Sequence, residues 1–145
     1  MIQIAAFWRM PDEEIMQGIL NVHDEIFQNA TDLERKIVEK HNVLVIAAID
    51  SGKVVGYKIG YEQSPGRYYS WYGAVQEKYR GKGIASKLMK KQHQLIAEAG
   101  YSMIETKTRN KWKEMLILNI QHGFDIVDTF VDSDGIHRIT MEKTL

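Results

Sequence analysis

Residues 75–86 have the residue types and spacing that best suit the binding of an anion. Their sequence, VQEKYRGKGIAS, places the run RGKG directly before a long amphipathic helix. Backbone N–H groups are free at a helix N-terminus and the helix dipole is positive there, so such a loop can hold phosphate. Gly81 and Gly83 let the backbone approach a phosphate closely, while Arg80 and Lys82 add full charges. The segment alone leaves open an ordinary glycine-containing loop before a helix.

Two common nucleotide-binding motifs do not fit this segment. A Walker A loop requires glycine at the position of Gln76 and serine or threonine at that of Gly83. A dinucleotide-binding G-x-G-x-x-G motif requires a third glycine where Ser86 stands, and it opens the first βαβ unit of a parallel sheet. Both arrangements are therefore excluded.

The apolar pattern predicts the elements that must position this loop. Helical spacing and capping residues predict helices at 11–27, 31–40, 84–99 and 111–122. Continuous or alternating apolar runs predict strands at 43–49, 53–61, 67–75, 102–108, 124–131 and 136–141. The strands at 67–75 and 102–108 are expected to be parallel, because a helix joins them as a crossover. The order predicts one α/β domain with a mixed sheet, spanning residues 1–145.

Composition limits the partners. The chain of 145 residues balances 19 basic against 19 acidic side chains, which argues against nucleic acid or a polybasic membrane surface as a partner. It has no cysteine, which excludes thiolate zinc sites and a cysteinyl acyl-enzyme. The histidines lack metal-ligand spacing, and no apolar run approaches the roughly 20 residues of a membrane span. We therefore expect a cytoplasmic protein with no metal.

Two motifs at a characteristic separation resemble a known family. The pattern Arg-x-x-Gly-x-Ala at 80–85, after the strand that ends at Val75, resembles the coenzyme A pyrophosphate loop of the GNAT superfamily of acyl-CoA-dependent N-acyltransferases. A second segment supports it: Asn110, then an apolar helix, then Gly123 and Phe124. The element order resembles the family's over essentially the whole chain. This resemblance implies an α/β (α+β) fold with a mixed, mostly antiparallel central sheet. The sheet would splay between strands four and five, here 67–75 and 102–108, with about four flanking helices.

The same resemblance implies how acetyl-CoA would bind as cosubstrate. The pantetheine arm would meet backbone groups of residues 73–75, where the two strands separate, and the pyrophosphate would meet the backbone of residues 81–86. Asn110 would reach the far side of the arm. The expected cofactor-binding residues are Gly73, Ala74, Val75, Arg80, Gly81, Lys82, Gly83, Ile84, Ala85, Ser86, Asn110 and Asn119.

The implied reaction is direct attack of a neutral amine on the thioester, which needs a base, oxyanion donors and an acid. Glu105 is the first candidate base, since it precedes Asn110 by a spacing that some family members share for their catalytic glutamate. Glu62 is the second candidate base. Two alternatives stay open: a water chain could accept the proton, or Glu105 could only form a salt bridge.

Asn119 stands where many members have a tyrosine that acts as the general acid. Asparagine cannot donate a proton at neutral pH, so its amide would contact the thiol or pantetheine, or satisfy a local backbone group. Tyrosines 68, 69, 72 and 79 are alternative donors.

We therefore expect an N-acetyltransferase that acts on a primary amine of a small molecule or peptide. The alternatives are an acyl-CoA-binding domain without transfer activity and an interaction domain, which the paired motifs disfavour. Family members are often dimers, so a homodimer is an expectation. The acceptor is expected near residues 23–31 and near aromatic and acidic side chains, namely Tyr57, Tyr61, Tyr68, Trp71, Asp24, Glu25 and Glu62.

Overall fold

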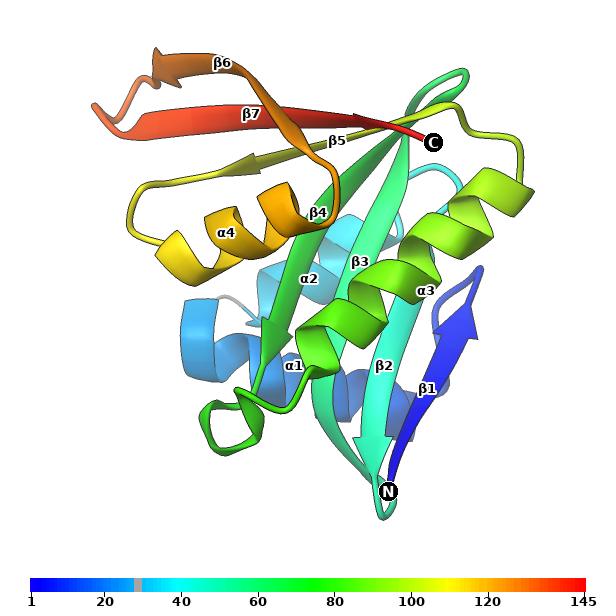
Figure 1. Ribbon diagram of the computed structural model, residues 1–145. Helices are drawn as coiled ribbons and strands as arrows, with labels where there is room; N and C mark the ends of the chain where they lie inside the picture. Colours follow the sequence, from blue (N-terminus) through cyan, green and yellow to red (C-terminus); the bar gives the residue numbers. More distant parts are fainter. Residues whose placement is uncertain (28–29) are drawn as a thin grey trace.

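The computed structural model describes residues 1–27 and 30–145 of the chain (Figure 1). The strands in this part are β1 (Ile2–Phe7), β2 (Leu44–Asp50), β3 (Lys53–Ser64), β4 (Arg67–Val75), β5 (Met103–Thr108), β6 (Asp125–Val131) and β7 (His137–Thr144). The helices are α1 (Glu13–Phe27), α2 (Ala30–Ile37), α3 (Ile84–Glu98) and α4 (Lys113–Gln121), with a short 3-10 helix η1 (Glu77–Tyr79) before α3. None of these helices is long and apolar enough to cross a membrane.

The strands form one sheet in the order β1-β2-β3-β4-β5-β7-β6. All neighbours are antiparallel except β4 and β5, which are parallel as predicted. The prediction was wrong in omitting β1. That short edge strand has weak alternation and obtains its backbone partners from β2, with Ile2 opposite Asp50 and Phe7 opposite Val45. Pairing at such a distance along the chain leaves no local signal.

The sheet divides between β4 and β5, as the expected fold requires. The two strands pair only from Arg67 opposite Met103 to Ser70 opposite Thr106. Beyond Ser70, β4 stays paired with β3 as far as Val75, whereas β5 stays paired with β7. The register with β3 also shifts here, since Ile59 lies opposite Tyr72 but Gly60 opposite Ser70. The extra residue is a β-bulge, which bends β4 away from β5.

Helices cover both faces of the sheet (Figure 1). Helices α1 and α2 pack on one face around a core that includes Ile19, Leu33 and Tyr57. Helices α3 and α4 pack on the other face, where Leu88 and Ile104 belong to a second core. The mixed sheet and four flanking helices confirm the predicted fold class.

Helix α4 differs from its prediction in extent and in burial. It begins at Lys113 and ends at Gln121, within the predicted range 111–122. Its sequence is apolar around most of its circumference, yet Ile117 and Ile120 are more than half exposed. Only the side toward the sheet is covered, and there Met115, Leu116 and Leu118 pack against the core.

Candidate active site

A cavity of about 790 Å³ lies where β4 and β5 separate. Its walls come from β3, β4, β5, α4, the start of α3 and the end of α1, with one residue each from β6 and β7. A cavity of this size matches the clefts of roughly 300–1,000 Å³ that hold small molecules and cofactors. The hydrogen bond from Thr106 Oγ1 to the carbonyl oxygen of Ser70, 3.0 Å long, marks the point where the strands rejoin.

The edge of β4 that faces this cavity has no strand partner. Gly73, Ala74 and Val75 pair with Lys58, Tyr57 and Gly56 of β3, and β5 does not reach them. All three line the cavity. An unpaired strand edge presents backbone donors and acceptors that need partners, and the amides of a pantetheine arm have matching groups.

The glycine-rich loop at the other end of the cavity has the backbone geometry of an anion site. Gly81 and Gly83 have φ values of +77° and +79°, which favour glycine, and Gly83 caps α3. Within the described residues, no N–H group of residues 81–86 donates a backbone hydrogen bond. Arg80 Nε donates to the carbonyl oxygen of Val75 at 3.1 Å, which ties the loop to the end of β4. Arg80 and Ala85 line the cavity itself.

The cavity is positively charged although the chain is neutral. Its lining contains seven lysines or arginines and two acidic residues. The cations are Lys58, Arg80, Lys107, Arg109, Lys111, Lys113 and Arg138. One acidic residue, Asp132, is engaged by Arg138 at 2.8 Å. Such a lining attracts a polyanion such as coenzyme A. The free N–H groups, the unpaired strand edge and this charge together fit that cofactor.

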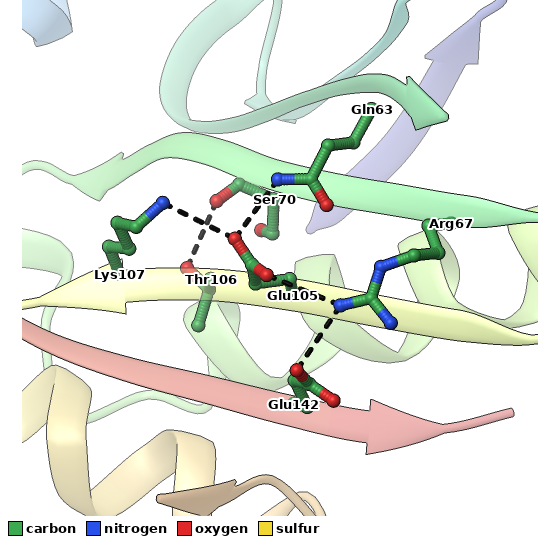
Figure 2. A network of polar contacts seen from close by, with 7 residues as sticks. All are labelled: Gln63, Arg67, Ser70, Glu105, Thr106, Lys107 and Glu142. Carbon is green, nitrogen blue, oxygen red and sulfur yellow. Dashed lines mark hydrogen bonds and ion pairs between the residues drawn. The ribbon is translucent and has the colours of Figure 1, made fainter. Parts of the chain in front are cut away.

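Glu105 sits in a network of cations beside the fork of the sheet (Figure 2). Its carboxylate accepts hydrogen bonds from Gln63 at 3.0 Å, from Arg67 at 3.3 Å and from Lys107 at 3.3 Å. Arg67 also contacts Glu142 at 3.2 Å. Burial acts to raise the pKa of Glu105, but the hydrogen bond from Gln63 and the charge and hydrogen bond of Lys107 outweigh it. The pKa therefore lies below its ordinary value, and Glu105 is ionised at neutral pH.

Glu62 and Asn110 lie away from the cavity lining. Glu62 Oε1 accepts hydrogen bonds from the Tyr101 hydroxyl at 2.8 Å and from Asn42 at 3.3 Å, near the end of α3. Asn110 is exposed beyond the end of β5. Glu105 is also outside the lining, although its neighbours Thr106 and Lys107 belong to it.

Asn119 is buried and faces the cavity. Its side chain is 3% exposed, and the cavity lining includes it. The amide Nδ2 lies 3.6 Å from Met141 Sδ, a weak contact. The backbone oxygen of Asn119 accepts from the N–H groups of His122 and Phe124, but its side chain satisfies no backbone group in the described residues. Of its two expected roles, contact with a ligand agrees better with this geometry.

Aromatic side chains form the wall on the α1 side of the sheet. Phe27 lies 5.4 Å from Tyr72 and 5.8 Å from Trp112, measured between ring centroids. Tyr57 and Trp71 also line the cavity. Phe27 belongs to the segment 23–31 that the sequence assigned to the acceptor region. Tyr72 and Trp112 were not assigned to it, because they come from two other elements whose proximity to Phe27 has no local signal. Residues 28 and 29 of the expected acceptor segment 23–31 lie outside the described residues.

The other residues that were expected near the acceptor lie at different places in the structure. Tyr68 is fully buried on the α3 side, where its hydroxyl donates to the Asn42 carbonyl oxygen, so assigning it to the acceptor region was wrong. Tyr61 packs against Trp71 at 5.4 Å. Asp24 is exposed, and Glu25 accepts a hydrogen bond from Gln76 at 3.2 Å.

Tyr57 and His23 form a buried pair beneath the aromatic wall. The Tyr57 hydroxyl and His23 Nδ1 are hydrogen bonded. Burial raises the pKa of Tyr57 and lowers the pKa of His23, although the charge of Asp24 partly opposes the latter. Both side chains are therefore neutral at neutral pH. Lys58 of β3 also lines the cavity, a position that no motif indicated.

Comparison with known proteins agrees with this geometry. The sequence matches the acetyltransferase (GNAT) family over residues 8–113. No curated protein matches it significantly in sequence. Among solved structures, Ard1 from Thermoplasma volcanium is similar with a TM-score of 0.81 at 20% identity, over 99% of this chain and 97% of that one. The ribosomal-protein-S18-alanine N-acetyltransferase from Escherichia coli gives 0.82 at 14% identity, over 99% and 94%. An aminoglycoside 6'-N-acetyltransferase complexed with coenzyme A gives 0.82 at 15% identity, over 98% and 96%.

At these identities the solved structures show a common fold, whereas the family match covers most of the chain. The matched residues include the glycine-rich loop, the edge of β4 and Glu105. The chain therefore belongs to the GNAT family of acetyltransferases, which use acetyl-CoA as the acetyl donor.

Proposed function

We propose that this protein transfers the acetyl group of acetyl-CoA directly to a primary amine of a small molecule or peptide. The observation that carries the proposal is the cavity with a cationic lining that runs from an unpaired strand edge to Arg80 and Ala85, on either side of the glycine-rich helix N-terminus. Each part matches one part of the cofactor. The strand edge suits the pantetheine amides, and the helix N-terminus suits the pyrophosphate.

Different residues along the cavity would bind different parts of the cofactor. The backbone of residues 81–86 would hold the pyrophosphate, with the charges of Arg80 and Lys82 beside it. Gly73, Ala74 and Val75 would bond the pantetheine arm as a strand does. Asn119 would donate its amide to the arm or the sulfur, because no backbone group of the described residues uses it. The acyl end would then reach the fork at Ser70, where the two strands rejoin.

Bound acetyl-CoA supplies a thioester whose carbonyl carbon is attacked by the amine. The amine must lose a proton, and we propose Glu105 as its acceptor, directly or through a water molecule. A carboxylate with a lowered pKa is a weak base at neutral pH, so Glu105 would release the accepted proton to solvent. This places its contribution near the lower end of general-base catalysis, about 100-fold.

The lining favours an acceptor without several positive charges. An aromatic wall suits the apolar part of an acceptor, while the cations of the cavity repel a polycation. Similar structures include an enzyme named for alanine of a ribosomal protein and one named for aminoglycosides. Between these classes, the charge favours a peptide amino terminus, an amino acid or a small monoamine.

The test has two stages, since an acyl-CoA-binding domain without transfer activity is the alternative. First, acetyl-CoA at a hundredfold excess over Kd should stabilise the fold by about 2.7 kcal/mol, measured by thermal or chemical unfolding. No stabilisation at saturation contradicts both candidates. Second, release of free thiol is measured across a panel of peptides, amino acids, monoamines and polycations. Binding without thiol release for any acceptor would favour the inactive domain.

A further inference from the structure

Lys58 is a buried cation in the wall of the cavity. It lies in the middle of β3, opposite Ile46 of β2 and Gly73 of β4. Ile46 belongs to the core on the α3 side, so the Lys58 side chain is on that side of the sheet as well. Its side chain is 7% exposed and lines the cavity.

Nothing in the described part of the chain neutralises this cation. Its Nζ has no hydrogen-bond or ion-pair partner among residues 1–27 and 30–145. The titratable groups whose charges couple to it are His93 of α3 and His122 at the end of α4, and Lys143 of β7 contacts His93 at 2.9 Å. All of these groups are basic. A buried ammonium without a partner is costly, which is why such a residue marks a site where a ligand supplies the partner.

The Lys58 ammonium lies beside the open edge of β4. A Cβ built on Gly73 would be 3.4 Å from Lys58 Nζ. Gly73 lies beyond Ser70, the last residue of β4 that pairs with β5. An arm that runs from the α3 N-terminus along Val75 to Gly73 brings its sulfur to this point, just before the strands rejoin.

We propose that Lys58 donates the proton that the coenzyme A sulfur requires as it leaves. This inference rests on the proposed acetyl transfer. The amine nitrogen forms a bond to the acetyl carbon, the carbon–sulfur bond breaks, and its electron pair stays on sulfur. One proton then moves from Lys58 Nζ to sulfur, giving the free thiol. Solvent returns a proton to the neutral Lys58 amine.

Three further observations support this assignment. Asn119 faces the same cavity but has no proton to donate at neutral pH. Glu105 pairs with Tyr69 and lies near Tyr61 on the α1 side of the sheet, so the proposed base and the proposed acid occupy opposite faces. Burial lowers the pKa of Lys58 to about 8. A general acid works best with a pKa near the working pH, so this value suits proton donation to a thiolate.

The first experiment needs no acceptor and no turnover. The pKa of the thiol of bound coenzyme A is titrated by thiolate ultraviolet absorbance in the wild type, Lys58→Met and Lys53→Met. Lys53 lies at the exposed start of the same strand and serves as the matched control. A neighbouring ammonium should lower the pKa of the bound thiol by about 1 unit or more relative to K58M. The control should match the wild type. Equal thiol pKa values in the wild type and K58M overturn the proposal.

The second experiment measures kcat against pH. K58M should lower kcat roughly 100-fold with little change in the affinity for acetyl-CoA. Wild-type kcat should fall as pH rises through about 8, because only the ammonium donates, and K58M should lose that fall. The neighbouring His93, His122 and Lys143 are present in both proteins, so the comparison isolates Lys58. Unchanged kcat in K58M, or a loss confined to cofactor affinity, overturns the proposal.

A second substitution separates proton transfer from charge alone. Lys58→Arg keeps a cation that does not release its proton in this pH range. It should lower the pKa of the bound thiol but leave kcat low. Full kcat in K58R overturns proton donation. If the wild type binds coenzyme A but acetylates no acceptor, the proposed function fails, and the thiol titration still decides whether Lys58 lies beside the sulfur.

Discussion

Substitution of Gly83 offers a direct test of the anion site. This residue caps α3 with φ +79°, and a Cβ placed on it meets no atom within 4 Å. A side chain therefore has room, and the backbone strain of a left-handed residue is the main cost to stability, about 1–2 kcal/mol. Asparagine and aspartate tolerate that conformation better than other residues and have the same shape. Comparing Gly83→Asn with Gly83→Asp thus isolates a single negative charge.

The effect of that charge follows from Coulomb's law. At about 5 Å from one phosphate charge, a carboxylate is repelled by about 1–3 kcal/mol for effective dielectric constants between water and a protein surface. This corresponds to acetyl-CoA binding that is roughly 5- to 150-fold weaker in Gly83→Asp than in Gly83→Asn. Isothermal titration calorimetry at low salt measures both affinities. The ratio should shrink toward unity near 1 M salt, where the screening length is about 3 Å.

Equal affinities of the two variants at low salt would refute the placement of the pyrophosphate at the α3 N-terminus. Unfolding curves of both variants supply the control, because their backbone strain is the same. A difference in stability without ligand would show that the charge acts on the fold itself, through the free N–H groups of residues 81–86.

Three other predictions follow from the same geometry. Glu105→Gln should lower kcat about 100-fold in steady-state assays without weakening acetyl-CoA binding. The control Glu142→Gln removes only the other carboxylate on Arg67 and should leave kcat unchanged. An equal loss of kcat in both variants would show that Glu105 has a structural role. Asn119→Leu should weaken acetyl-CoA binding about 5- to 10-fold in calorimetry, because one hydrogen bond to the cofactor is lost. Unchanged affinity would contradict a contact between Asn119 and the cofactor. Burial lowers the pKa of His93 to about 3, so the unfolded chain binds more protons, and the free energy of unfolding should fall as pH drops below about 6.5. His93→Gln should reduce that slope by about 1.4 kcal/mol per pH unit in urea titrations, and an unchanged slope would show that His93 is protonated in the fold.

The glycine-rich loop was predictable because its chemistry is local. Positions 81 and 83 have positive φ values, a backbone conformation that favours glycine. The helix that follows can be recognised from the spacing of its apolar residues. The long strands and helices were predictable for the same reason. By contrast, β1 depends on hydrogen bonds to β2 along the sheet edge, so its six residues had no signal of their own.

The candidate bases show what local spacing leaves open. The spacing between Glu105 and Asn110 singled out this glutamate only by its resemblance to some family members. Its partners Gln63 and Arg67 come from the β3–β4 hairpin. Those partners determine that its pKa lies below the ordinary value. Glu62 is also a glutamate, so residue type does not distinguish it from Glu105. Only folding places Glu62 beside Tyr101 and outside the cavity lining.

The sequence by itself determined the fold class, the family and the position of the glycine-rich loop, because each rests on patterns within one or two neighbouring elements. The tertiary structure alone decided which side chains meet. Lys58, Gly73 and Asn119 belong to β3, β4 and α4, and they share one cavity because a bulge separates β4 from β5. A lysine inside an apolar strand was visible in the sequence, but its lack of a partner was not, since burial and pairing depend on every element packed around it.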